Sequence, residues 1–355
     1  MDLSNRENTN WAERSKYWLG KSQELPPQRG HPKRRDRRPI IICGHGARLQ
    51  IDRGTLFVRN GFTHYPQAQD EYRYFRGDPH LPSRIIIFDA SGSISFNVLE
   101  WLGQMQIPLI QVDWQGNVIC VANSDYSANA KLVQKQLAQL EEGNSEQEFR
   151  KLLIVKFNNS ISTLDIFPES GEKAAAVQFL RQSITALKDR TPLSNSALLG
   201  LEGDAAARYF RVWKGIPICW KLTKRDLIPK DWHFIGVRRS AIAKSNRNAR
   251  HPVNAMLNYA YAVLHGQVKL RIIAEGLDPT IGISHQKAKY RDALVLDRME
   301  PLRPVVDKVV LALMMNEAFS SGDFTTSNDG HCRLNPQLAR RIVQLVCQSL
   351  PEHSN

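Results

Sequence analysis

Four side chains in the second half of the chain could together bind a divalent metal ion. His285 follows the stretch Ile-Gly-Ile-Ser, and Asp297 and Glu300 come shortly after it. Glu202, in the run Gly-Leu-Glu-Gly-Asp, is a further oxygen donor that is distant in the sequence. Mg²⁺ and Mn²⁺ prefer carboxylate oxygens with at most one imidazole. The residue types therefore predict a Mg²⁺ or Mn²⁺ site.

Three of these residues also have a structural interpretation. His285 on its own could be a core histidine. Asp297 and Glu300 match the Asp-x-x-Glu pattern of a helix capping box, with Pro301 in the first turn. The two interpretations are compatible, because Glu300 could point into a cleft while Asp297 anchors the turn.

Glu202 is set apart by the glycines on either side of it, Gly200 and Gly203. Each glycine inside a helix costs about 1 kcal/mol relative to alanine. That cost favours a close approach of another group at this place. The alternative is an ordinary exposed helical glutamate.

The length and the net charge of the chain limit the classes of protein to which it can belong. A chain of 355 residues with 42% apolar residues suggests two domains with a sizeable core. Lys and Arg number 48 against 35 for Asp and Glu, so the formal net charge is +13. An excess of this size favours a polyanionic partner, and nucleic acid before a membrane.

Cysteine usage and hydropathy indicate a cytoplasmic protein. The five cysteines are scattered and have no Cys-x-x-Cys spacing, which is typical of reduced thiols. No apolar run approaches the ~18 residues of a membrane span, and the N-terminus has no signal-peptide core. We therefore expect no membrane association.

Changes of pattern along the chain predict an α+β protein, with an N-terminal β-rich domain followed by an all-α catalytic domain. Residues 1–38 are polar and basic, which favours a disordered extension, with a DNA-contacting arm as the alternative. Residues 39–123 contain short β-prone runs and one helix near 95–104. Residues 124–355 have helical periodicity, with helices expected near 127–141, 145–164, 172–188, 194–213, 253–274, 300–318 and 335–348.

The segment 211–250 combines strong positive charge with aromatic residues. It holds eleven basic and two acidic residues. Trp213, Trp220, Trp232 and Phe234 lie between them. This pattern suits phosphate contacts together with stacking on an unpaired base, although the tryptophans could instead belong to the core. The predicted DNA contacts are Arg238, Arg239, Lys244, Arg247 and Arg250, together with Arg303 outside the segment.

Three motifs resemble a known family in this order and spacing. They are Gly-Leu-Glu-Gly-Asp-Ala-Ala-Ala-Arg-Tyr-Phe at 200–210, Pro-Val-Asn-Ala-Met-Leu-Asn-Tyr-Ala-Tyr-Ala at 252–262, and Gly-Leu-Asp-Pro-Thr-Ile-Gly-Ile-Ser-His at 276–285, followed by Leu-Asp-Arg-Met-Glu-Pro-Leu-Arg-Pro at 296–304. The chain from about residue 39 to 351 thereby resembles the CRISPR-associated spacer-acquisition integrases, the "Cas one" endonuclease family. It departs from that family in its N-terminal extension and at His265, where many members carry a tyrosine.

The resemblance implies a site and an activity. Glu202, His285 and Glu300 match the family's metal-binding catalytic triad, with Asp297 beside them, and Arg303 could pair with Glu300 or hold a phosphate. The implied reaction is metal-dependent attack of a 3′-hydroxyl of a short DNA fragment on a phosphodiester of a CRISPR repeat array. With water as the nucleophile, the same site would be a nuclease. In the cell this activity would be spacer acquisition, a part of antiviral defence.

The resemblance also implies partners: double-stranded DNA, a homodimer and a small ferredoxin-like companion protein. The exposed edge strands of the β domain are the expected dimer surface. Two alternatives stay open, a transposase-like or branched-DNA nuclease of the same fold and a non-catalytic DNA-binding scaffold. The end of the chain soon after the helical region disfavours a transposase with an added DNA-binding module, and the intact acid–histidine–acid set disfavours a scaffold.

Overall fold

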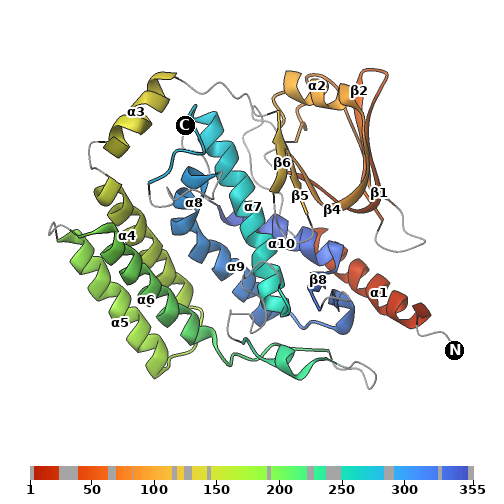
Figure 1. Cartoon of the computed structure of the whole chain (residues 1–355). Helices are drawn as coiled ribbons and strands as arrows, with labels where there is room; N and C mark the ends of the chain where they lie inside the picture. Colours follow the sequence, from red (N-terminus) through yellow and green to blue (C-terminus); the bar gives the residue numbers. More distant parts are fainter. Residues whose placement is uncertain are drawn as a thin grey trace.

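The computed structural model has a β-rich N-terminal region beside a larger helical region (Figure 1). It describes residues 4–23, 39–62, 69–82, 84–113, 118–123, 130–141, 145–189, 193–221, 228–236, 249–283, 292–326 and 330–350. The predicted α+β class is confirmed. The sheet lies at one end of the molecule and helices α4 (Ser145–Leu164), α5 (Gly171–Lys188) and α6 (Asn195–Trp213) lie at the other.

The N-terminal region is built on one six-stranded sheet with strand order β3-β2-β1-β4-β5-β6. β1 is parallel to β4 and β4 to β5, whereas the remaining pairs are antiparallel. Helix α2 (Phe96–Gln104) makes the connection between the parallel strands β4 and β5. The strands are β1 (Ile40–Asp52), β2 (Thr55–Arg59), β3 (Glu71–Tyr74), β4 (Ile85–Ile94), β5 (Leu109–Val112) and β6 (Val118–Ala122).

β1 is one long strand where the sequence predicts two short ones. The Gly-His-Gly stretch at 44–46, which in the sequence resembles part of a glycine-rich loop but has no helix after it, forms a bulge within the strand. Gly44 and Gly46 have φ values of 84° and 72°, which favour glycine. A Cβ at Gly44 would lie 2.6 Å from the carbonyl oxygen of Phe62. The two glycines therefore serve the close packing of this strand.

The sheet buries both of its faces. One face, with Ile42 and Leu102 of α2, forms a small core of its own. The other, with Phe88 and Ile110, joins the main core of the helical region. Phe88 contacts Tyr259 of helix α7 (Pro252–Ala274) at a ring separation of 4.3 Å. The sheet thus packs directly on the central helix of the second region.

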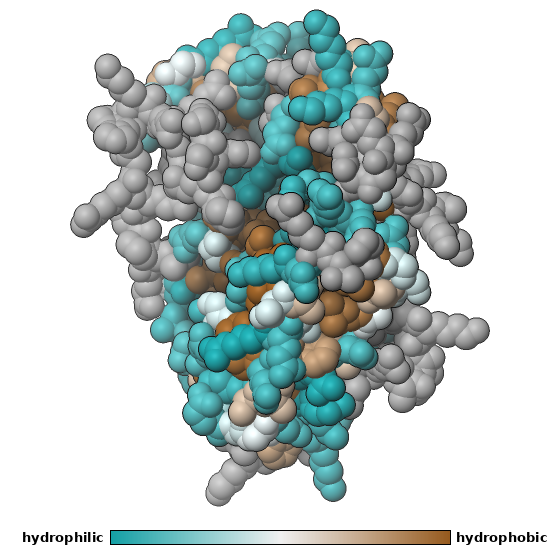
Figure 2. Space-filling view, turned by 90° about the vertical axis from the view of Figure 1, so that its left-hand side faces the viewer, coloured by the Kyte–Doolittle hydropathy of each residue, from teal (hydrophilic) through white to brown (hydrophobic). Residues whose placement is uncertain are grey.

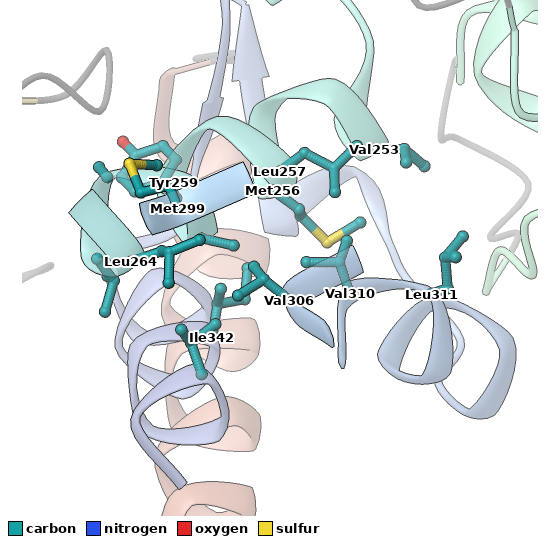
Figure 3. Close-up of a cluster of buried hydrophobic side chains, with 14 of the residues drawn as sticks. Val253, Met256, Leu257, Tyr259, Leu264, Met299, Val306, Val310, Leu311 and Ile342 are labelled. Atoms are coloured by element: carbon teal, nitrogen blue, oxygen red, sulfur yellow. The ribbon is translucent and has the colours of Figure 1, made fainter. Parts of the chain in front are cut away.

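The helical region is organised around α7, which begins after the side-chain cap His251. Figure 3 shows its apolar residues Met256 and Leu264 packed with Val306, Val310 and Ile342 from α9 and α10. The other elements are α3 (Ala130–Glu141), η1 (Lys230–His233), α8 (Ala293–Met299), η2 (Glu300–Leu302), α9 (Arg303–Asn316), η3 (Ser321–Asp323), β7 (Phe324–Thr326), β8 (Cys332–Leu334) and α10 (Pro336–Ser349).

Two short stretches of this region differ from the sequence prediction. The single helix expected near 300–318 is the short turn η2 followed by α9, and it is preceded by α8, which the sequence analysis does not predict. Pro301 and Pro304 lie near the junctions, because proline cannot donate a backbone hydrogen bond. The polar stretch from Ser321 onward, whose residue types alone indicate a loop, contains η3 and the strand β7, which pairs with β8. The helical region therefore includes a small β-hairpin.

The N-terminal extension differs from the expected disordered tail at residues 4–23, which form helix α1 (Ser4–Gln23) against α10 and η3. Trp18 of α1 is 0% exposed. Its Nε1 donates to Asp323 at 2.6 Å, and Arg14 donates to the same carboxylate at 2.8 Å. The sequence hides this contact because the partners are more than 300 residues apart. Residues 24–38 lie outside the described part.

On the face shown in Figure 2, hydrophilic side chains predominate among the coloured residues and hydrophobic ones are scattered between them. Within the described residues, none of the helices combines the length and the apolar character that crossing a bilayer requires.

Candidate active site

Glu202 lies on α6, which begins at Ser194, whose Oγ accepts the backbone N–H of Ala197 at 3.2 Å. The Glu202 side chain is 19% exposed and turns toward the neighbouring helix α4. A Cβ at Gly200 or Gly203 would meet no described atom of the chain within 4 Å. The close approach that these glycines predict is therefore not made by the described chain, and the helix beside Glu202 is open.

Glu300 lies in the tight η2 turn between α8 and α9 and is 8% exposed. Side chains of helix α4 hold this turn by donating hydrogen bonds to the turn's backbone carbonyls. Asn159 Nδ2 donates to the Pro301 oxygen at 2.7 Å, and Thr163 Oγ1 donates to the Pro304 oxygen at 2.6 Å. These two hydrogen bonds fix the turn that carries Glu300 against α4.

The structure brings Glu202 and Glu300 together around one cation, the ammonium of Lys156 on α4. Lys156 Nζ lies 2.5 Å from Glu202 Oε1 and 2.6 Å from Glu300 Oε2. Burial lowers the pKa of Lys156, but the opposing effect of Glu300 and Glu202 is larger and raises it above its ordinary value. The second Glu300 oxygen lies 3.0 Å from Nε of Arg303. The two carboxylates thus share a buried, charge-balanced site.

Asp297 has an anchoring contact. It lies within α8 and is 1% exposed, and its Oδ2 accepts the backbone N–H of Ile283. Because Asp297 is inside a helix, the capping-box interpretation of Asp297 and Glu300 is wrong. The carboxylate holds the last described residue before the segment that contains His285. Its role as a metal ligand stays a prediction.

Several predicted site residues fall outside the described part of the chain. They are His285, Arg238, Arg239, Lys244 and Arg247. Among the residues that the structure does describe, no three His, Cys, Asp or Glu side chains cluster as a metal site. Of the predicted triad of Glu202, His285 and Glu300, the structure therefore describes the two glutamates.

The aromatic residues of segment 211–250 are mostly core. Trp213 and Trp232 are 2% and 6% exposed, and Trp220 stacks on Trp232 at a ring separation of 6.1 Å. The alternative that the tryptophans belong to the core is thus the one the structure shows, whereas Phe234 is 54% exposed. Arg250 is exposed and keeps its predicted role as a DNA contact.

Two further charged groups near the site were not predicted from the sequence. Lys156 carried one usable signal, because it interrupts the apolar run Leu-Leu-Ile-Val-Lys-Phe within a helix. Asp307 accepts from Tyr209 Oη at 3.0 Å and from Tyr261 Oη. The Arg303 guanidinium lies 5.2 Å from the Tyr261 ring centroid, so this buried network borders the site.

His265, the departure from the resembling family, has a defined partner. Its Nε2 lies 3.3 Å from Asp292, which also binds Lys269 at 2.9 Å. Burial raises the pKa of Asp292, but the hydrogen bonds from His265 and Lys269 outweigh burial and hold it below its ordinary value. The histidine therefore belongs to a charge cluster at the start of α8.

Comparison with known proteins places the chain in a family. The family model described as CRISPR associated protein Cas1 matches residues 40–348. The chain belongs to the Cas1 family. A CRISPR-associated endonuclease Cas1 from Archaeoglobus fulgidus is 24% identical over 88% of both chains. A Cas4 exonuclease/Cas1 endonuclease fusion from Geobacter sulfurreducens is 36% identical over 42% of this chain and 25% of the fusion, so the match spans a quarter of that longer protein.

Solved structures show the same fold. A casposase bound to its integration product superposes with a TM-score of 0.71 and 25% identity, covering 88% of this chain and 82% of the casposase. A Cas1 protein from Thermotoga maritima superposes with a TM-score of 0.64 and 18% identity, covering 88% and 90% of the two chains. This chain is thus a Cas1-family protein of the nuclease and integrase type, and the α1 helix lies outside the residues that the family model matches.

Proposed function

We propose that this Cas1-family chain is a metal-dependent DNA integrase and endonuclease that inserts short DNA fragments into a CRISPR repeat array. The observation that carries the proposal is the meeting of Glu202 and Glu300, from distant segments, at one buried cation. The names of the relatives, Cas1 endonucleases, and of the casposase caught with an integration product support it.

The donor set fits a divalent cation. Two carboxylates already contact the Lys156 ammonium, so their oxygens enclose a place that holds a positive charge. Oxygen atoms of this kind are the ligands that Mg²⁺ and Mn²⁺ prefer. Glu202, Glu300 and His285 would hold the ion, with Asp297 alongside them. When bound, it would supply charge stabilisation for a phosphoryl group under attack.

Other residues of the protein would orient the metal ligands and accommodate the DNA. Arg303, fixed between Glu300 and the Tyr261 ring, would orient that carboxylate. Asp297 would hold the approach to His285 through the Ile283 backbone. The open flank of α6 at Gly200 and Gly203 would leave room for a DNA strand beside Glu202. Arg238, Arg239, Lys244, Arg247 and Arg250 would bind backbone phosphates without reading sequence.

Partners and location follow as part of the proposal. A similar chain is solved in complexes of Cas6-RT-Cas1 with Cas2, and we infer a small ferredoxin-like companion for this chain as well. A homodimer formed through the β-rich region would supply two sites for the two ends of one fragment, and β3 and β6 are the edge strands of its sheet. The protein would act in the cytoplasm.

The test is a strand-transfer assay. Purified protein, with and without its companion, is mixed with a labelled duplex bearing 3′-hydroxyls and a supercoiled plasmid carrying the repeat array, in Mg²⁺ or Mn²⁺. The proposal predicts label covalently joined to the plasmid, and no joining in EDTA. Cleavage without joining would favour a branched-DNA nuclease, and binding without either would favour the scaffold.

A transposase-like integrase is the second candidate, favoured by the casposase superposition. The two differ in target. Joining confined to the borders of the repeat supports the CRISPR function, whereas equal joining to a matched plasmid without the array supports the transposase-like one.

A further inference from the structure

Lys156 is the one cationic side chain found directly between the two glutamates in the part of the chain that the structure describes. It comes from the middle of α4, the helix that also holds the turn of Glu300 through Asn159. Its side chain is 15% exposed. The ammonium therefore occupies the very space that the carboxylate oxygens enclose.

Charge balance determines what this contact does. Lys156 and Arg303 offset the charges of Glu202 and Glu300 without any metal. A divalent ion between the same oxygens would add two positive charges within a few ångströms of the ammonium, in a poorly solvated place. Like charges at such distances repel strongly where water is scarce. The ion and the ammonium therefore cannot share the space.

We propose that Lys156 is a resident counter-ion of the metal site: it holds the two carboxylates together before metal binds and is displaced by the metal. The inference rests on the proposed function. It makes Lys156 a positioning residue that sets the metal concentration at which the protein becomes active. Removing its charge would leave two facing carboxylates without their cation, so that metal binds more tightly.

The experiment is calorimetric titration of MnCl₂ into the full-length protein at one fixed neutral pH. The variants are Lys156→Met, Lys156→Gln and Lys156→Arg. Lys151→Met is the matched control, because Lys151 is on the same helix and pairs with Glu148 at 2.6 Å on the surface. We expect the Mn²⁺ Kd of the two neutral variants to fall at least tenfold, which is about 1.4 kcal/mol. Lys156→Arg and Lys151→Met should stay within about threefold of wild type, because about 0.6 kcal/mol is the size of a surface effect.

Two further readouts separate this role from a merely structural one. The Mn²⁺ concentration for half-maximal strand transfer should fall in parallel with Kd. In EDTA the thermal midpoints of the neutral variants should lie below wild type, and Mn²⁺ should raise them by more than it raises wild type.

Different outcomes would contradict the inference and the proposed function on which it rests. Neutral variants that bind Mn²⁺ as weakly as Lys151→Met, or more weakly, overturn the inference while leaving the metal site intact. Neutral variants that fail to fold even with Mn²⁺ also overturn it, because the metal then does not replace the ammonium. Wild type that binds no Mn²⁺, with Glu202→Gln giving the same result, overturns the proposed function itself.

Discussion

Replacing Trp18 by alanine tests whether α1 is an integral part of the helical region. Trp18 is 0% exposed and its indole nitrogen donates to the buried Asp323 at 2.6 Å. Truncating a buried tryptophan costs about 3–5 kcal/mol. A hydrogen bond to a charged group contributes about 1.5–3 kcal/mol, part of which the first figure already contains. We expect a loss of about 5 kcal/mol, a large fraction of the about 5–15 kcal/mol that stabilises a typical domain.

The assay is urea unfolding followed by far-ultraviolet circular dichroism, which does not depend on the removed chromophore. A loss of this size should lower the midpoint by more than about 1 M. Trp11→Ala is the control, because Trp11 lies on the same helix and is only half-buried. Equal midpoints for the two variants, both close to wild type, would refute the docking of α1.

Three other predictions follow from the contacts of the site and its supports. Tyr209→Phe removes a donor to the buried Asp307 and should cost about 1.5–3 kcal/mol in urea unfolding, whereas Phe210→Leu on the half-buried neighbour should cost less. Gly282→Ala puts a Cβ 2.5 Å from the Ala293 carbonyl carbon, so we expect a loss of about 1–3 kcal/mol and slower strand transfer; unchanged stability and rate would contradict the close approach. Burial lowers the pKa of His251, the cap of α7, below its ordinary value of 6.5. The stability that the neutral histidine contributes is therefore complete above pH 6.5 and is lost as the pH falls below that value. His251→Asn should flatten this part of the pH profile of thermal stability, and a profile identical to wild type would show that His251 does not titrate there.

The order of sheet and helices was predictable because each region has its own period. Runs such as Ile40–Cys43 are β-prone and short, and most helical segments end close to where their periodicity ends. The turn at Glu300 was less predictable. Pro301 and Pro304 disrupt a helical pattern, but whether they kink one helix or divide it depends on the α4 side chains that bind their carbonyls.

The glutamates of the site were found because the motifs around them are distinctive, whereas their cation was not. Lys156 is far from Glu202 and Glu300 in sequence, and its position between them depends on how α4 packs against α6 and η2. The same holds for α1. Arg14 and Trp18 are buried because both donate hydrogen bonds to Asp323, and the sequence of the first residues alone does not indicate this partner.

The most direct test of the central claim compares turnover and DNA binding in Glu202→Gln and Glu300→Gln. Glu148→Gln is the matched control, because Glu148 forms the surface pair with Lys151. If the two glutamates bind the catalytic metal, single-turnover strand transfer should fall by a factor on the order of 10² or more, since the ion contributes several kcal/mol of transition-state stabilisation. DNA affinity should stay near wild type, and the control should keep both. Strand transfer that persists at the control's rate in either variant would contradict the account.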